Sequence, residues 1–323
     1  MNLQETNKIM FNSFIKKQLI CPLEFNKSSG KVEDNVIKQN KNEIIFKNQK
    51  YDVVDNVIDM RFLKDREYTS YDNVLTDWKI PNLKIDSKVL KKSIDASGIN
   101  ESDIKDKVIL IAGTGVGTEL NLILNLKPKF VVALDFSDFL ISLSKKDYYK
   151  NLPILFIMGD LCNIPFKTES FDYIFSGGII QMTRTPELAH RGLWRVLKKK
   201  GYLNYSHIYL ENLHNRRVSL DRLFYNLHNK NIKYAKSFLR IYCFIYFILI
   251  KTRILKFINR KSWRLPFLLE LNGNVNASEY YNGAIDYYLP RYRHMIKEED
   301  VFDWFVKCGG KVKRTPKGFI SKK

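Results

Sequence analysis

Three glycines in one short loop are the residues of this chain that point most directly to chemistry. Gly113, Gly115 and Gly117 follow the apolar run Val108–Ala112 and precede Thr118–Leu126, whose apolar residues have helical spacing. A glycine-rich turn between a strand and a helix lets a ligand approach the backbone closely and presents free N–H groups at the helix N-terminus. Such a loop is typical of a nucleotide-binding site.

The spacing of these glycines disfavours two common nucleotide-binding loops. A dinucleotide-binding loop has the pattern G-x-G-x-x-G, and Gly117 comes one residue too early for it, leaving Thr118 at the third glycine position. A P-loop requires G-x-x-x-x-G-K-[ST], and the loop contains no lysine. The loop alone therefore does not identify its ligand.

Polar or small residues also follow the next apolar runs along the chain. Asp135 ends the run KFVVALD, 22 residues after Gly113. A carboxylate there can accept two charge-assisted hydrogen bonds from ribose hydroxyls, although aspartates at strand ends also serve as helix caps. Asp160 follows the run LPILFIMG, and the run FDYIF breaks at Ser176–Gly178. We interpret these positions as further walls of one ligand site.

The elements that must position these residues alternate between strands and helices. Continuous apolar runs are typical of strands that are buried on both faces of a parallel sheet. Helices are expected over 118–126, 136–146 (with Ser137 as N-cap) and 185–200 (with Gly201 after it), and a fifth strand over 202–210. Residues 298–310 read as a helix that precedes two short strands. The pattern predicts an α/β fold with a Rossmann-like, doubly wound, seven-stranded and mostly parallel sheet.

Four segments are expected along the chain. A small β-rich N-terminal unit covers 15–65, and the Rossmann-like core covers 66–212. A basic and apolar helical insertion covers 213–280, and 281–323 supply the last helix and strands that complete the core.

Together, the glycine loop, Asp135, Asp160 and the break at Ser176–Gly178 resemble the class I S-adenosylmethionine-dependent methyltransferases. The likeness is greatest to the enzymes of ubiquinone and menaquinone biosynthesis and runs continuously over residues 107–209. It implies S-adenosyl-L-methionine as the cofactor and methyl transfer as the reaction.

The resemblance also implies a role for each part of the site. The loop Gly113–Gly117 would pack on the amino-acid part of the cofactor, Asp135 would bind the ribose, and Phe136 would lie against the adenine. The pair Asp160–Leu161 would meet the adenine edge, and Ser176–Gly177 would offer backbone groups to the methionine end. The cofactor-binding residues implied are Gly113, Thr114, Gly115, Gly117, Asp135, Phe136, Asp160, Leu161, Ser176 and Gly177.

The loop departs from the family pattern at one position that touches the cofactor. Many members carry an acid two residues before the first glycine, contacting the cofactor's amino group, and this chain has Ile111 there. Thr114 also replaces a common cysteine. A subset of the family with Ala-Gly-x-Gly at this point also lacks the acid, and Ala112-Gly113 is similar to it. We therefore do not interpret Ile111 as a loss of binding.

The N-terminal stretches LICPLEF and IIFKNQKYDVVDNVIDM resemble a zinc-ribbon-type domain that precedes some bacterial methyltransferases. That pattern contains two CxxC pairs, of which this chain keeps only Cys21, while Glu24, Ile44 and Lys47 stand at the other positions. A structural zinc needs about four ligands, so a ribbon here would be degenerate and no metal site is expected. A generic three-stranded cap is the alternative.

No catalytic residue is assigned from the sequence. A general base assists methyl transfer to a phenol, hydroxyl or amine, and Tyr205, His207 and His294 are candidates, with packing or structural roles as the alternative. The NPPY-type tetrad of methyltransferases that modify amino groups of nucleic acids is absent after the fourth strand, where SGGI stands. Its absence disfavours adenine and cytosine amino groups as acceptors.

Charge is concentrated in the C-terminal half. The net charge is +20; residues 1–188 carry 26 basic against 25 acidic residues, and 189–323 carry 28 against 9. Residues 213–264 hold 13 basic residues and one acid, Asp221, which indicates an anionic partner. Within them, Ile241–Ile250 is an unbroken nonpolar run that would make a helix of about 15 Å, half a bilayer core.

Three roles are considered for this segment: a lid over the acceptor site, an interfacial element on an anionic membrane, and a nucleic-acid platform. The last is the least favoured, because apolar and basic residues are segregated along the chain rather than interleaved.

We therefore expect an S-adenosylmethionine-dependent methyltransferase acting on a small or lipophilic acceptor. The alternative is a non-catalytic module of the same fold that docks on a membrane surface or RNA through its basic half. The four cysteines form no CxxC pair, and the first 17 residues contain no long apolar run. These features predict a cytoplasmic protein, with peripheral contact to anionic membrane through 213–264.

Overall fold

The apolar runs of the sequence form strands of one mixed sheet. The computed structural model describes residues 3–21, 36, 38–46, 49–61, 83–208, 226–227, 231–251, 281, 284–285, 290 and 292–323. Within these residues the sheet has 11 strands in the order β1-β2-β3-β4-β7-β6-β5-β8-β9-β11-β10. The strands are β1 (Lys38–Gln39), β2 (Glu43–Ile45), β3 (Lys50–Val54), β4 (Val57–Asp59), β5 (Val108–Ala112), β6 (Phe130–Asp135), β7 (Ile154–Met158), β8 (Phe171–Gly177), β9 (Leu197–Ser206), β10 (Lys311–Thr315) and β11 (Gly318–Lys322).

Seven of these strands confirm the expected doubly wound core. Strands β7, β6, β5, β8 and β9 are parallel, and β11 is antiparallel to both β9 and β10. From β5 the chain first moves outward through β6 to β7 and then returns to β8 on the other side of β5. This reversal is a topological switch point, and ligands of such sheets bind at the carboxyl ends of the strands beside it.

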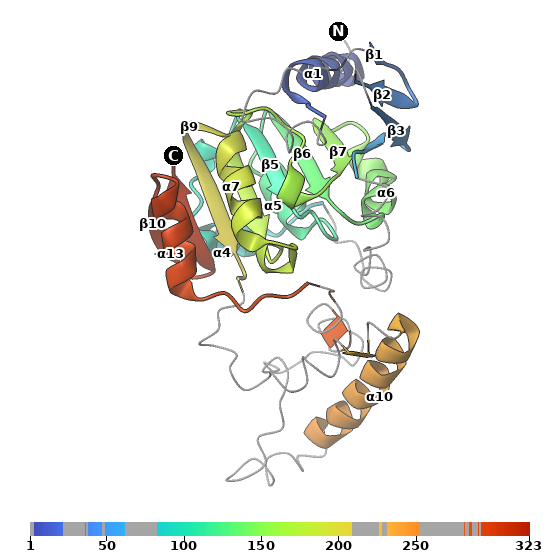
Figure 1. Ribbon diagram of the computed structural model, residues 1–323, viewed down its shortest axis with the longest axis vertical. Helices are drawn as coiled ribbons and strands as arrows, with labels where there is room; N and C mark the ends of the chain where they lie inside the picture. The colour runs from blue at the N-terminus through green and yellow to red at the C-terminus, as the bar shows by residue number, and fades with distance from the viewer. Residues whose placement is uncertain are drawn as a thin grey trace.

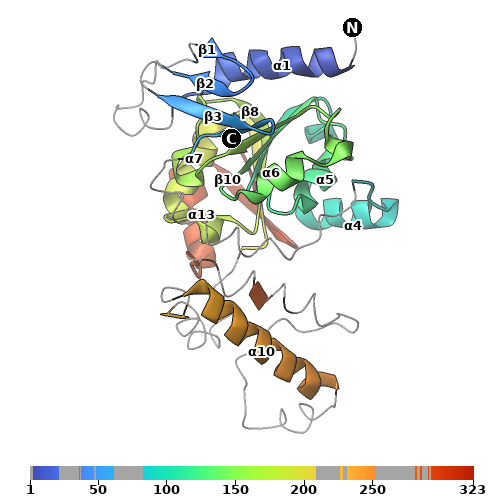
Figure 2. The same ribbon diagram turned by 90° about the vertical axis from the view of Figure 1, so that its right-hand side faces the viewer.

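Helices cover both faces of the sheet, which explains the continuous apolar strands (Figures 1 and 2). Helices α7 (Pro186–Val196) and α13 (Glu298–Lys307) lie on one face, and α4 (Ser87–Ser97), α5 (Thr118–Leu124) and α6 (Phe139–Ser144) lie on the other. Short 3-10 turns complete the core: η2 (Glu101–Asp103), η3 (Asp147–Tyr149), η4 (Leu161–Asn163) and η5 (Ile180–Met182).

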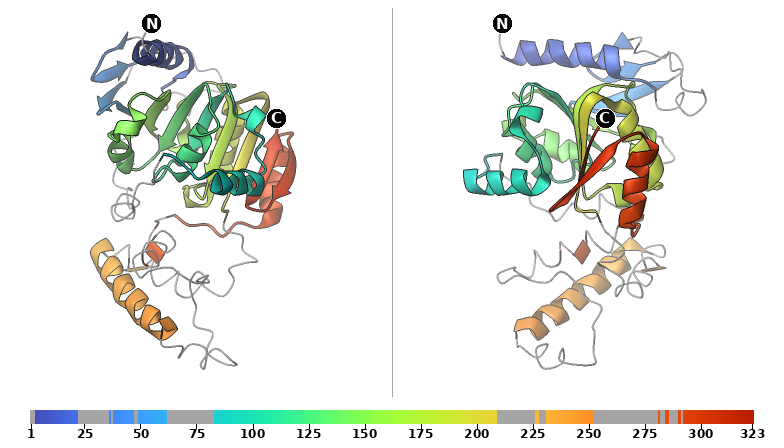
Figure 3. Two further views of the ribbon diagram at one scale, coloured as in Figure 1. Left: turned by 180° about the vertical axis from the view of Figure 1, so that it is seen from behind. Right: turned by 90° about the vertical axis from the view of Figure 1, so that its left-hand side faces the viewer.

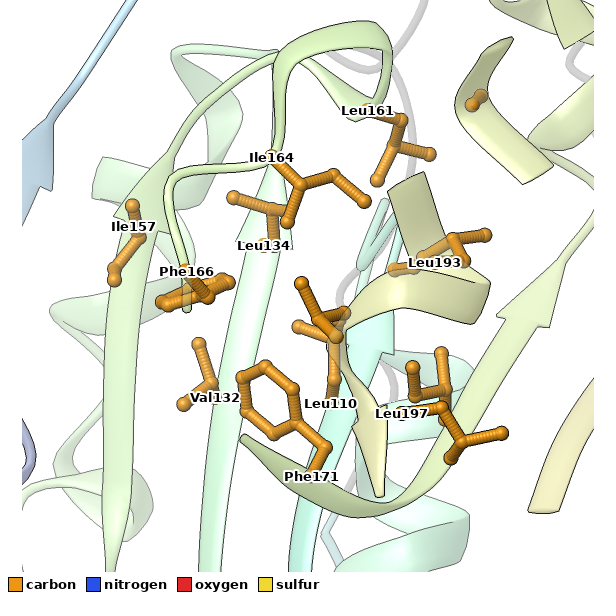
Figure 4. Packing of buried hydrophobic residues seen from close by; sticks show 14 of the residues in the cluster. Leu110, Val132, Leu134, Ile157, Leu161, Ile164, Phe166, Phe171, Leu193 and Leu197 are labelled. Carbon is orange, nitrogen blue, oxygen red and sulfur yellow. The ribbon is translucent and has the colours of Figure 1, made fainter. Parts of the chain in front are cut away.

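Alternate residues of each central strand pack into one of two cores. Leu110 and Val132 pack with Leu193 of α7 in the first core (Figure 4). Their neighbours Ile109 and Val131 belong to the second core, under α5 and α6. Because side chains alternate across a strand, one apolar run fills both. Each fully buried aliphatic side chain contributes about 1.5–3 kcal/mol.

The prediction of a helix over 185–200 is wrong for its last four residues. Helix α7 ends at Val196, and Leu197 begins β9 by pairing with Phe171 of β8. Lys198 Nζ lies 2.9 Å from Asp172 Oδ1, which fixes the start of β9. The three lysines before the glycine have good helix propensity, but pairing with β8 overrides that weak preference.

The β-rich N-terminal unit joins the core sheet, because β4 pairs in parallel with β7. A helix that the sequence analysis did not predict, α1 (Leu3–Gln18), packs beside it at the end of the sheet opposite α10 (Figure 3). The ring of Phe14 lies 5.0 Å from that of Phe130 at the start of β6. Long-range packing of this kind has no local sequence signal.

The zinc-ribbon resemblance remains a prediction. Cys21 is buried, with its sulfur 3.5 Å from the Tyr51 hydroxyl, and Ile44 lies in the core. Glu24 and Lys47 lie outside the described residues. Among the residues that the structure does describe, no three His, Cys, Asp or Glu side chains are grouped as metal ligands.

Helix α10 (Ile232–Lys251) is the part of the basic insertion that the structure describes at length. Its 20 residues span about 30 Å, twice the length expected from the apolar run alone. Ala235, Leu239 and Cys243 are buried along one side. The helix lies beyond the carboxyl ends of the parallel strands (Figures 1 and 3). Within the described parts of the chain, no helix combines the length and apolarity needed to cross a membrane.

Candidate functional site

The glycine loop connects β5 to α5 at the switch point. The Gly113 and Thr114 amides donate to the Leu134 carbonyl at 2.8 and 3.2 Å, which ties the loop to β6. Gly113, Gly115 and Gly117 have φ values of +83°, +51° and +93°, a region that side chains rarely adopt. A Cβ atom added to Gly115 would meet no atom within 4 Å. The loop thus keeps an open face toward a ligand.

Asp135 lies at the carboxyl end of β6, beside this loop. Its Oδ2 accepts a hydrogen bond of 2.7 Å from the Gly115 amide, and its Oδ1 accepts one of 2.9 Å from the Ser137 amide. The residue is 6% exposed. Each oxygen of an ionised carboxylate can accept more than one hydrogen bond, so bracing of the loop is compatible with binding of a ribose. The prediction of Ser137 as N-cap is wrong by one position, because α6 begins at Phe139 and Asp138 is its N-cap; the Ser137 hydroxyl still accepts from the Phe139 amide at 3.0 Å.

An ion-pair network that the sequence analysis missed holds the loop after Asp135. Arg61, just after β4, donates from Nε and Nη2 to the two carboxylate oxygens of Asp59, each at 3.0 Å. Its Nη2 also donates to Asp138 Oδ1 at 2.6 Å, and its Nη1 donates to the Phe136 carbonyl at 2.8 Å. The guanidinium carbon lies 5.8 Å from the centroid of the Phe136 ring. The N-terminal unit therefore fixes the segment expected to meet the adenine.

The pair Asp160–Leu161 is engaged within the protein. The Asp160 carboxylate accepts from the Cys162 amide at 2.8 Å and pairs with Arg184. The Leu161 side chain packs in the core beside Ile164 (Figure 4). Contact of Leu161 with an adenine edge would therefore have to come from its backbone.

At the ends of β8 and β9 the structure brings together polar groups that the sequence placed far apart. The Ser176 and Ser206 hydroxyls are buried and have no hydrogen-bond partner among the described residues. A Cβ added to Gly177 would lie 3.0 Å from both Glu119 Oε1 and Ser206 Oγ. Buried hydroxyls usually have a partner, so the unpaired Ser206 oxygen beside Gly177 fits a site for a polar ligand, such as the amino-acid part of the expected cofactor. Glu119 and Ser206 were not predicted, because only the fold brings them to Gly177.

Of the three candidates for a general base, Tyr205 has the packing role that the sequence analysis gave as the alternative. It is fully buried, and its hydroxyl lies 2.8 Å from Nδ1 of His190, a residue whose pKa burial lowers to about 4. His207 and His294 both lie at the carboxyl ends of the strands, beside Gln181. The Gln181 side chain donates to the His207 carbonyl at 3.0 Å, and the His294 amide donates to the Gln181 carbonyl at 2.9 Å.

A hydrogen bond of His294 and the pKa of His207 decide how each of the two rings can accept a proton. The His294 Nε2 lies 3.0 Å from the Thr183 carbonyl, which only accepts, so Nε2 carries the proton. Partial desolvation, together with the nearby Lys317 ammonium, lowers the pKa of His207. A neutral imidazole at neutral pH can accept a proton.

Comparisons with known proteins identify a methyltransferase domain in the chain. Residues 110–204 match the family described as "Methyltransferase domain". The chain is 28% identical over 143 residues to malonyl-[acyl-carrier protein] O-methyltransferase of Marinomonas sp. (strain MWYL1). That match covers 44% of this chain and 48% of the relative, so the chain spans about half the length of the curated relative that it matches.

Two solved structures illustrate the fold-level matches. An S-adenosylmethionine-dependent methyltransferase from Mesorhizobium loti is 11% identical, with 73% of this chain and 94% of that chain covered and a TM-score of 0.42. A candidate methyltransferase from Bacillus halodurans is 17% identical, with 71% of each chain covered and a TM-score of 0.41.

The matched family domain contains the glycine loop, Asp135 and the end of β8, and it stops two residues before the end of β9. Residues 110–204 of the chain therefore contain a methyltransferase domain, the part of the sequence in which the likeness to S-adenosylmethionine-dependent methyltransferases lies.

Proposed function

We propose that this chain transfers a methyl group from S-adenosylmethionine to a small or lipophilic acceptor. One observation carries the proposal: the Asp135 carboxylate and the open glycine loop meet at the carboxyl ends of β5 and β6, joined by the 2.7 Å bond from the Gly115 amide. An acid beside a glycine loop at a switch point suits a ligand that combines a ribose with a charged amino-acid group.

The bound cofactor would supply a methyl group that is already electrophilic. The chain's own residues then have to hold the acceptor in line and keep water out. The loop after β8 and the segment around His294 border the carboxyl ends of the strands, where an acceptor would enter. His207, with its lowered pKa, is a candidate to take a proton from a hydroxyl or phenol there.

A lipophilic acceptor is supported by the surface of α10. Five exposed apolar residues follow one another at distances of four, three, four and three positions, which places them along one side of the helix. They are Tyr234, Phe238, Ile241, Ile245 and Ile248. Lys233, Lys236 and Arg240 form a neighbouring basic stripe, and the helix contains no acidic residue. We propose that α10 lies on an anionic membrane surface, with the apolar stripe in lipid and the basic stripe at the head groups.

Labelled methyl transfer tests the proposed reaction. The protein would be incubated with methyl-labelled S-adenosylmethionine and, in separate arms, with a lipid extract, a pool of small hydrophilic metabolites, malonyl-[acyl-carrier protein] and RNA. Label is expected in the lipid or small-molecule arm and should fall at least about 10-fold with Asp135→Ala, which removes charge-assisted hydrogen bonds. Label in RNA alone would contradict the acceptor class. Cofactor binding without label in any arm would favour the non-catalytic module.

A further inference from the structure

Ile111 stands where many members of the resembled family carry an acid, and the neighbouring helix α5 carries a carboxylate, Glu119. Ile111 lies in the buried cluster under α5, in register with Phe175 of β8. Gly177 is two residues beyond Phe175 on the same strand and therefore faces the same side of the sheet. The carboxylate of Glu119, from the first turn of α5, lies over Gly177.

The geometry around Gly177 defines a small polar site. A Cβ at this position would lie 3.0 Å from Glu119 Oε1, 3.2 Å from Glu119 Cδ and 3.0 Å from Ser206 Oγ. The two oxygens thus approach Gly177 from different elements, Glu119 from helix α5 and Ser206 from strand β9. Gly177 and Ser206 are paired in the β8–β9 register.

Ser206 supplies the second and independent observation. It is 1% exposed, and its hydroxyl has no hydrogen-bond partner among the described residues. A buried hydroxyl without a partner is costly, and a ligand atom that bonds to it would remove that cost. A carboxylate and a hydroxyl, both acceptors, at one point suit a primary ammonium group, which has three donors and no acceptor.

We propose that Glu119, with Ser206, binds the α-ammonium group of the cofactor's amino-acid part and takes the place of the acid absent at Ile111. This inference rests on the proposed use of S-adenosylmethionine. It explains why a glycine stands at 177, because any side chain would occupy the space between the carboxylate and the hydroxyl. Gly177 has no positive φ, so space rather than backbone conformation requires the glycine.

Two ligands that differ in the amino-acid part test the assignment by calorimetric titration. S-adenosylhomocysteine carries the ammonium group, and methylthioadenosine lacks the whole amino-acid part. Glu119→Gln should weaken binding of S-adenosylhomocysteine by about 10- to 100-fold, the loss expected for a hydrogen bond between charged groups. The same variant should leave binding of methylthioadenosine unchanged. Glu187→Gln, in the first turn of α7, is the matched control and should change neither affinity.

A second variant keeps the test decisive if Glu119→Gln is poorly folded. Gly177→Ala adds a methyl group that crowds both the Glu119 carboxylate and the Ser206 hydroxyl, so it should give the same selective loss. Wild-type affinity of both variants for S-adenosylhomocysteine, or an equal loss for both ligands, would overturn the assignment. A wild-type protein that binds neither ligand would overturn the proposed function itself. The titration of the wild type thus distinguishes failure of the Glu119 assignment from failure of the proposed function.

Discussion

At the scale of single residues, Gly113 is the most tightly constrained position of the cofactor loop. A Cβ atom added there would lie 2.5 Å from the Cβ of Ile179, in the loop after β8. Gly115 shares the positive φ but has open space, with no atom within 4 Å. An alanine at Gly115 would therefore cause backbone strain alone, whereas an alanine at Gly113 would cause both backbone strain and overpacking.

Gly113→Ala should cost about 1–3 kcal/mol more in the free energy of unfolding than Gly115→Ala, because overpacking adds to the shared conformational strain. Urea denaturation of the two variants measures the difference. Equal losses would show that Ile179 moves aside, and the loop would then not be fixed by its contact with the end of β8.

At the scale of elements, β4 positions the loop that follows β6. The guanidinium of Arg61 bonds to Asp59, Asp138 and the Phe136 carbonyl, and its side chain is 3% exposed. Five N–H donors in a rigid fork allow one arginine to hold several acceptors at once, whereas lysine offers a point charge. The N-terminal unit thus has a role in the site even without a metal.

Arg61→Lys should lower the free energy of unfolding by about 2–4 kcal/mol, since it breaks part of a buried ion pair. It should also weaken binding of S-adenosylhomocysteine severalfold, because the Asp135–Asp138 segment loses its brace. Arg191→Lys, in an exposed pair with Glu187 on α7, is the control and should cost less than about 1 kcal/mol. Unchanged cofactor affinity in Arg61→Lys would limit β4 to a structural role.

Elements were predictable where the signal was local. Five parallel strands, helix α13 and the C-terminal hairpin follow from apolar runs and turn residues, and Asp135 follows from its place at the end of a run. The start of β9 was not predictable, because Leu197 is a strand residue only through its pairing with Phe171. Glu119, Ser206 and Arg61 were missed for the same reason: each acts on a residue more than 25 positions away in the chain.

At the scale of the whole molecule, the basic helix α10 and the cofactor site lie toward the same end of the sheet. Helix α10 lies beyond the strand ends that carry Asp135 and Gly177 (Figure 1). A membrane surface bound by α10 would therefore face the entrance to the site. This arrangement suits an acceptor that partitions into lipid.

Ile241→Gln combined with Ile245→Gln should reduce co-sedimentation with anionic vesicles at low salt by about 10-fold or more, because burial of each isoleucine contributes about 1.5–3 kcal/mol. These residues are 62% and 53% exposed. Val306→Gln, at a 65% exposed site on α13, is the control. Indifference of the wild type to anionic lipid would contradict the membrane role, since that attraction is strongest at low salt. A loss of methyl transfer without a change in vesicle binding would favour the lid.

The most direct test of the whole account is a calorimetric titration of the full chain with S-adenosylhomocysteine. We expect saturable binding by the wild type and an affinity at least about 10-fold lower in Asp135→Ala, which would lose charge-assisted bonds to the ribose. Asp147→Ala, whose side chain is 90% exposed in a surface ion pair, should bind as the wild type does. No binding at millimolar ligand, or equal binding by Asp135→Ala, would contradict the assignment of this pocket to S-adenosylmethionine.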